Sequence, residues 1–184
     1  MTTLTSKQTF GFIILCPDKN IAGLKNTLNS FENVYSDIPR ICIVGNNATE
    51  DEVAKMNEVC TTFKGLNTIT SLINLGMKKT KSDWNVIIFA GSRVRPIVQK
   101  EFDLFVKSEK DILFHVVDGK YTFCEGSMNG IIMHKRTFLE VGNFISSPIT
   151  KVDMNEMEVV KLLWSLDAIE KGCVFKAILG MRIV

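Results

Sequence analysis

The chain has 184 residues, of which 46% are apolar and 23% charged, and its formal net charge is +2. This length suits one domain, and this apolar content supports a sizeable core and excludes a disordered protein. So small a net charge does not indicate a nucleic-acid or anionic-membrane partner. The longest apolar runs, Phe10–Cys16 and Val86–Ala90, are far shorter than the ~20 residues that span a bilayer.

The cysteines and the start of the chain indicate a reducing compartment. The 5 cysteines are scattered and never spaced as C-x-x-C, which predicts reduced core thiols. Met1–Gln8 is polar and lacks the regions of a secretory signal, so we expect a cytoplasmic protein. His115 and His134 are far apart without flanking ligand residue types, and no zinc site is expected.

In the first half of the chain, apolar runs of strand length alternate with longer helical patterns. This alternation is typical of βαβ units around a mostly parallel sheet. Strands are expected over Thr9–Cys16, Arg40–Val44, Thr61–Lys64 and Trp84–Ala90. Helices are expected over Ile21–Phe31, from the Thr49 and Glu52 capping box to about Cys60, and over Thr68–Lys79.

The second half has a mixed pattern. Helices are expected over Val98–Lys107, Arg136–Val141 and Asn155–Lys171, the last ended by Gly172. Strands are expected over Asp111–Val117, Lys120–Cys124, Gly130–Met133, Val174–Ala177 and Met181–Val184, with a hairpin turn at Asp118-Gly119.

Three loops are candidates for a site, because ligands of open α/β sheets bind beyond the carboxyl ends of the strands. They are Pro17–Ile21, Gly45–Glu50 and Gly91–Pro96. The chain has no G-x-x-x-x-G-K-[ST] loop, and no G-x-G-x-x-G follows the first strand. The two commonest nucleotide-binding signatures of α/β folds are therefore excluded.

Four blocks, in order, resemble the family 2 glycosyltransferases with a GT-A fold. They are Ile13–Asn20, Ile43–Glu50 (similar to V-D-N-G-S-T-D), Asn74–Trp84 (N-x-G, then D-W) and Gly126–Phe144 (G, R, then V-G-x-F), and they cover roughly residues 9–145. The resemblance implies a GT-A-like three-layer α/β/α sandwich with a mostly parallel central sheet. It implies a single domain over residues 1–184, with a nucleotide-binding half (9–95) and an acceptor-side half (96–184).

The resemblance also implies transfer of a sugar from a nucleotide-diphosphate sugar to a hydroxyl of a glycan or other acceptor. The residues that it implies for binding the nucleotide sugar are Pro17, Asp18, Asn46, Asn47, Glu50, Gly91, Ser92, Arg93 and Arg95. Gly130 and Arg136 fall on the acceptor side. The implied catalytic base is Glu156 or Asp153, and Asp167 is a second possible position for it.

The sequence departs from the family at the metal-binding D-x-D motif. That motif falls on Gly91-Ser92-Arg93 or, shifted by one residue, on Ala90-Gly91-Ser92, and neither contains a carboxylate. Mg²⁺ and Mn²⁺ need oxygen ligands, preferably charged ones, so neither a metal nor a cofactor is expected. Arg93 and Arg95 can stabilise a diphosphate instead, through bidentate hydrogen bonds.

The alternative interpretations follow from the same residues. Arg93 and Arg95 can be ordinary surface residues, and Asn46 and Asn47 can serve only as turn residues. Acidic residues such as Glu156 also suit the first turn of a helix for electrostatic reasons alone. The competing hypothesis is a non-catalytic GT-A-derived module that binds a glycan, a nucleotide or a protein. A third is nucleotidyl chemistry on a similar fold.

Overall fold

The structure is a computed structural model that describes residues 8–31, 37–94, 104–115, 127–145 and 156–178. Its elements, in chain order, are β1 (Phe10–Cys16), α1 (Ile21–Asn29), β2 (Arg40–Gly45), α2 (Glu50–Asn57), β3 (Thr62–Gly65), α3 (Ile69–Lys79), β4 (Trp84–Phe89), β5 (Asp111–His115), β6 (Ser127–His134), α5 (Lys135–Val141), α6 (Glu156–Glu170) and β7 (Val174–Ile178).

Seven strands form one sheet in the order β3-β2-β1-β4-β6-β5-β7. β1 pairs in parallel with β2 and β4, β2 with β3, and β5 with β7. Among the described strands, only β6 runs antiparallel to its neighbours, β4 and β5. The sheet is therefore mostly parallel, and the parallel half precedes the mixed half, as the sequence predicts.

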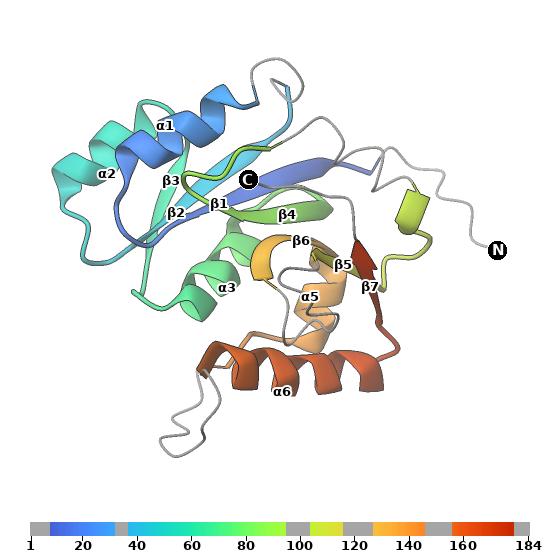
Figure 1. Cartoon of the computed structure of the whole chain (residues 1–184). Coiled ribbons are helices and arrows are strands. Elements are labelled where there is room, and N and C mark those ends of the chain that lie inside the picture. Colours follow the sequence, from blue (N-terminus) through green and yellow to red (C-terminus); the bar gives the residue numbers. More distant parts are fainter. Residues whose placement is uncertain (1–7, 32–36, 95–103, 116–126, 146–155, 179–184) are drawn as a thin grey trace.

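Helices cover both faces of the sheet, which gives three layers (Figure 1). α1 and α2 lie on one face, and α3, α5 and α6 lie on the other. A hydrophobic core lies on each face of the sheet, and alternate residues of β1 belong to one or the other. Phe12 and Ile14 pack toward α1, and Ile13 and Leu15 pack toward α3. A strand buried on both faces requires an almost continuous apolar run, which β1 supplies.

Polar side chains fix the ends of the helices in the first half. The capping box of α2 is confirmed, because the Glu52 N–H donates to Thr49 Oγ1 at 3.2 Å and the Thr49 N–H donates to Glu52 Oε2 at 2.7 Å. α2 ends at Asn57 rather than near Cys60. Asn57 Oδ1 accepts the N–H of Thr62 at 2.8 Å, which joins the end of this helix directly to β3.

The second half differs from expectation mainly in its boundaries. The chain is helical at Leu104–Phe105 but has left the helix by Lys107, whose N–H donates to Asp111 Oδ2 at 2.6 Å. α6 ends as predicted, with Gly172 in the left-handed region at φ +79°. The expected Asp118-Gly119 turn, with strand 120–124, strand 181–184 and the start of helix 98–107, lies outside the described residues.

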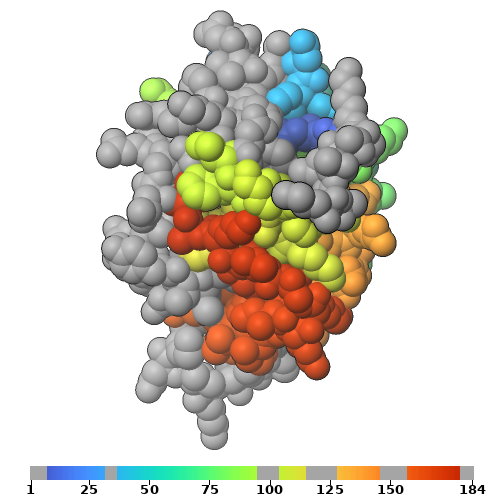
Figure 2. All heavy atoms as spheres, turned by 90° about the vertical axis from the view of Figure 1, so that its right-hand side faces the viewer, coloured from blue at the N-terminus to red at the C-terminus, as the bar shows by residue number. Residues whose placement is uncertain are grey.

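β7 forms one edge of the sheet and is joined to the segment before β5. Lys176 Nζ lies 2.8 Å from the buried Asp111 Oδ2 and donates to the Phe105 carbonyl at 2.8 Å. Figure 2 shows this side of the molecule, where α6 and β7 lie beside residues 104–115. No helix within the described ranges is long and apolar enough to cross a bilayer.

The predicted core thiols are confirmed for four cysteines. Cys16, Cys42, Cys60 and Cys173 are buried and free, and Cys124 lies outside the described residues. Burial raises the pKa of Cys60 to about 11, so this thiol is not poised to react.

Candidate functional site

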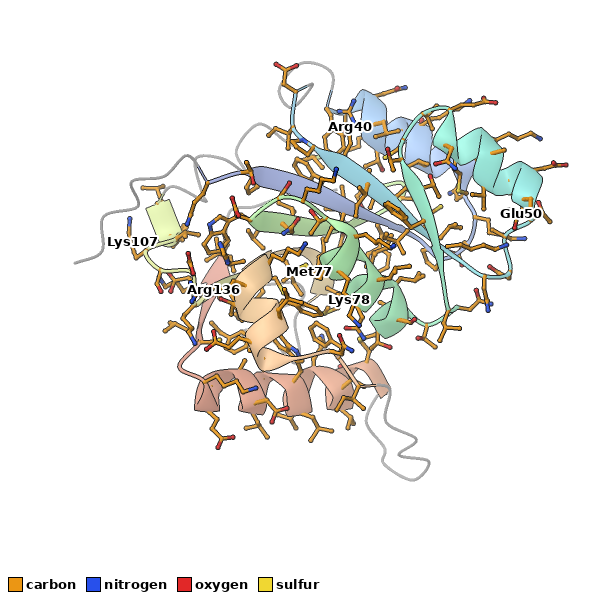
Figure 3. All side chains as sticks on the ribbon, turned by 180° about the vertical axis from the view of Figure 1, so that it is seen from behind. Arg40, Glu50, Met77, Lys78, Lys107 and Arg136 are labelled. Atoms are coloured by element: carbon orange, nitrogen blue, oxygen red, sulfur yellow. The ribbon has the colours of Figure 1, made fainter. Side chains whose placement is uncertain are left out.

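The loops after β1, β2 and β4 begin side by side at one edge of the sheet. Cys16 pairs with Val44, and Leu15 pairs with Phe89, so these three strands end at the same level. This is the edge at which ligands of open α/β sheets bind. Figure 3 shows Glu50 at this edge and Arg40, the first residue of β2, at the other end of the strand.

The loop after β1 carries the exposed Asp18 and the partly buried Pro17. Lys19 adopts a left-handed conformation with φ +54°, and its Nζ lies 3.4 Å from Glu52 Oε1 in α2. A hydrogen bond from the Thr49 N–H, with a smaller contribution from Lys19, lowers the pKa of Glu52. The first loop is therefore tied to the helix that follows the second.

The loop after β2 exposes Asn46 and Asn47. The Asn47 N–H donates to Asn67 Oδ1 at 3.2 Å, and a Cβ placed on Gly45 would come within 2.2 Å of the same oxygen. Glycine at position 45 therefore leaves room for Asn67. Asn67 is a single amide between β3 and α3, and no motif in the sequence pointed to it.

Glu50, the first residue of α2, also reaches β3. Its Oε1 lies 2.9 Å from Lys64 Nζ, although the Glu50 side chain is 87% exposed. An ion pair this exposed contributes little to stability, and the Glu50 carboxylate can exchange Lys64 for another donor.

The loop after β4 is held against α1. Gly91, at φ +101°, donates its N–H to Thr27 Oγ1 at 2.9 Å and lies 3.0 Å from the Gly23 carbonyl oxygen. The Val94 N–H donates to Ser30 Oγ at 3.1 Å. Arg93 lies between these anchors and is exposed.

Ser92 points inward and contacts β6. It is 8% exposed, and its Oγ lies 3.0 Å from Asn129 Nδ2 and 3.3 Å from Asn129 Oδ1. In the described part of the chain, no group of three or more His, Cys, Asp or Glu side chains is placed to hold a metal ion. No sequence signal pointed to Asn129.

The structure does not bring Arg136 to the other candidates. β6 runs antiparallel to β4, with Ile131 opposite Ile87 and His134 opposite Trp84, so Gly130 lies toward the carboxyl edge and Arg136 beyond the amino edge. Arg136 Nη1 lies 3.6 Å from Glu109 Oε2 there. Figure 3 shows Arg136 and Glu50 at opposite ends of the sheet.

The expected bases belong to the segment around the start of α6. α6 leads into β7, which begins at the amino edge, and Figure 1 shows the other end of the helix, where Glu156 lies, toward the side on which β1 ends. Asp167 lies in the later, exposed part of the helix. Asp153 and Arg95 lie outside the described residues.

A second polar cluster lies at the amino edge, away from the candidate loops. A cavity of about 390 Å³ opens there and is lined by Gln8, Asp83, Glu109, His134, Lys135, Arg136 and Leu139. His134 caps α5, since its Nδ1 accepts the N–H of Arg136 at 3.1 Å. Burial lowers the pKa of His134, while Glu109, with Oε1 3.8 Å from Nε2, and Asp83 oppose this effect.

The three-layer architecture and the mostly parallel sheet are those of the GT-A-like glycosyltransferases. Solved structures of the Staphylococcus aureus protein TarS share this fold. One TarS structure matches with a TM-score of 0.59 and 12% identity over 96% of this chain, and TarS 1-349 in complex with UDP matches with a TM-score of 0.59 and 11% identity over 96% of this chain.

This chain spans 36% of the first TarS structure and 59% of the second. At such low identity the comparison defines the fold and nothing further. No protein-family model and no curated protein sequence matches the chain.

Proposed function

We propose that the protein binds a nucleotide-diphosphate sugar across the loops after β1, β2 and β4 and transfers the sugar to an acceptor hydroxyl. The observation that carries this proposal is the loop after β4, which is anchored to α1 and exposes Arg93, and which follows a strand that ends level with β1 and β2. The fold supports it, and TarS 1-349, which shares the fold, was crystallised with UDP.

The nucleoside and the diphosphate would contact different loops. Asp18, Asn46, Asn47 and Glu50 supply exposed carboxylates and amides, which suit the hydroxyl and N–H groups of a ribose and a base. Gly91 leaves space above the loop after β4, since a Cβ on it would meet no atom within 4 Å. The phosphates would lie over this loop, within reach of Arg93.

Arg93 would replace the cation of related enzymes, and Arg95 would assist it. A guanidinium group donates two parallel hydrogen bonds to phosphate oxygens and offsets the charge that develops on the leaving diphosphate. The acceptor oxygen attacks the anomeric carbon, and the bond from that carbon to the diphosphate oxygen breaks. The diphosphate leaves with the electron pair, and the acceptor proton passes to a carboxylate, Glu156 or Asp153.

A non-catalytic GT-A-derived module is the second candidate. The absence of a carboxylate from Gly91–Val94 favours it, together with the engagement of the Ser92 hydroxyl by Asn129. Such a module would bind a nucleotide or a glycan at the same edge but would transfer nothing.

Calorimetry with UDP and UDP-sugars, in EDTA and again in Mn²⁺, tests the proposal. We expect equal affinity in both buffers, and a higher unfolding temperature with ligand, because a ligand of the native state stabilises it. Failure of any nucleoside diphosphate to bind at millimolar concentration would contradict both nucleotide interpretations. Binding of UDP-sugars without turnover, across a panel of hydroxyl acceptors, would favour the non-catalytic module.

A further inference from the structure

The side chain of Asn129 takes the place of backbone pairing at the end of β4. The backbone register between β4 and β6 runs from Trp84 opposite His134 to Ile87 opposite Ile131. Beyond it, the Phe89 N–H donates to the Asn129 side-chain Oδ1 at 3.1 Å. Gly130 sits at this point with φ +87°, a conformation that favours glycine.

The same amide holds the next loop. With Oδ1 oriented toward the Phe89 N–H, Asn129 Nδ2 donates to Ser92 Oγ at 3.0 Å. Ser92 is drawn inward and is 8% exposed, and Val94 is drawn inward on the other side and is 4% exposed. Arg93, between two inward-facing neighbours, is exposed to solvent.

We propose that Asn129 is a positioning residue for a nucleoside diphosphate: it holds Ser92 so that Arg93 faces the phosphates without help from a cation. This inference rests on the proposed function. Asn129 would act through Ser92 and Arg93 and need not touch the ligand. A neutral amide would order this loop before the nucleotide arrives, which lowers the ordering cost of binding.

The test compares Asn129→Leu with Asn85→Leu. Asn129 is half-buried, and Asn85 is a buried amide of the same sheet. Asn85 lies at the amino end of β4, where its Oδ1 accepts the Thr80 hydroxyl at 2.7 Å and its Nδ2 donates to the Ser82 carbonyl at 3.1 Å. Both variants lose side-chain hydrogen bonds that are buried or partly buried, and both should unfold at lower temperature. Only Asn129→Leu should alter the loop after β4.

Two measurements are made on each folded variant: amide hydrogen exchange of Gly91–Val94, and the affinities for UDP and UMP. We expect Asn129→Leu to speed exchange of these amides at least tenfold and to weaken UDP binding about tenfold more than UMP binding. Asn85→Leu should leave both unchanged. If Asn129→Leu does not fold, Ser92→Ala removes the other partner of this contact and leaves the acceptor for Phe89, and it should show the same selective loss.

The outcomes separate this inference from the proposed function. If the wild type binds UDP, and the Asn129 variant has the same UDP affinity and the same amide exchange in the loop after β4, the positioning role alone is overturned. Equal losses of UDP affinity in the Asn129 and Asn85 variants would also overturn it, because a general loss of structure would then explain both. A wild-type protein that binds no UDP would overturn the proposed function and this inference together.

Discussion

Lys19 Nζ lies 3.4 Å from Glu52 Oε1, so one ion pair joins the loop after β1 to α2, the helix that follows the loop after β2. Lys19 adopts φ +54°, a left-handed conformation that is unfavourable for a residue with a side chain. Strain of this kind is retained where surrounding structure imposes it, and it concentrates at functional sites.

The first prediction separates the strain at Lys19 from its ion pair. Lys19→Gly and Lys19→Ala both lose the pair, but only glycine adopts the left-handed conformation at little cost. The glycine variant should therefore be more stable than the alanine variant by about 1 kcal/mol in urea unfolding. Equal stabilities would show that the backbone at Lys19 relaxes freely.

The second prediction concerns Gly91, at φ +101°, and uses Gly142, at φ +108°, as its control. A Cβ at either position meets no atom within 4 Å, so alanine there acts through backbone strain and not through a clash. Each alanine variant should lose roughly 1–2 kcal/mol of stability. UDP affinity should fall only in Gly91→Ala, as calorimetry can measure; an equal loss in Gly142→Ala would place the effect outside the site.

Much of the sheet could be predicted from the sequence because its strands are short apolar runs with clear ends. β1 stops before Pro17, and β2 ends in the turn at Gly45-Asn46. The capping box at Thr49 and Glu52 is equally local. Such signals depend only on neighbouring residues, so the local structure that they predict does not depend on how the rest of the chain folds.

The contacts that shape the candidate site could not be predicted in this way. Asn129 and Ser92 are 37 residues apart, and Asn67 and Asn47 are 20 apart, so their pairing depends on strand order and register. The position of Arg136 likewise could not be predicted from neighbouring residues. This residue belongs to a block that resembles the acceptor side of the family, but the antiparallel direction of β6 carries it to the opposite edge.

The third prediction is that Mn²⁺ does not bind at the loop after β4. The loop offers no carboxylate, and the Ser92 hydroxyl is already engaged by Asn129. Calorimetry should detect no Mn²⁺ binding at micromolar concentration, with or without UDP. Micromolar binding that Ser92→Ala abolishes would contradict this expectation.

The fourth prediction is a pH dependence of stability caused by His134. Its pKa in the folded protein is lowered from an ordinary value of 6.5, mainly by burial. The unfolded chain therefore binds the proton first, and stability present above pH 6.5 is lost as the pH falls through the lower, folded pKa. Protonation of Nδ1 would also remove the acceptor that caps α5.

His134→Asn isolates this effect, since asparagine is a good N-cap residue without a titrating ring. Urea unfolding between pH 4.5 and 7.5 should show a shallower loss of stability in the variant than in the wild type. Asp83 and Glu140, whose pKa values are lowered by hydrogen bonds, contribute only at more acidic pH. Parallel pH profiles for the two proteins would exclude His134 as the cause.

The last prediction concerns Arg93. If its guanidinium binds the diphosphate, Arg93→Ala should weaken UDP binding by about 1.5–3 kcal/mol, the range for hydrogen bonds to charged groups. Arg93→Lys should recover only part of this, because an ammonium group cannot make the bidentate contact. The wild-type affinity should also fall as salt screens the charges.

Arg40→Ala is the matched control, because it removes the same charge at the far end of β2 (Figure 3). It should leave UDP affinity unchanged, which would show that net charge alone does not set binding. Glu156→Gln completes the series: it should bind UDP as the wild type does but transfer no sugar, because a base acts on the acceptor and not on the diphosphate. If Arg93→Ala and Arg40→Ala bind UDP equally well, Arg93 is an ordinary surface residue and the non-catalytic interpretation gains support.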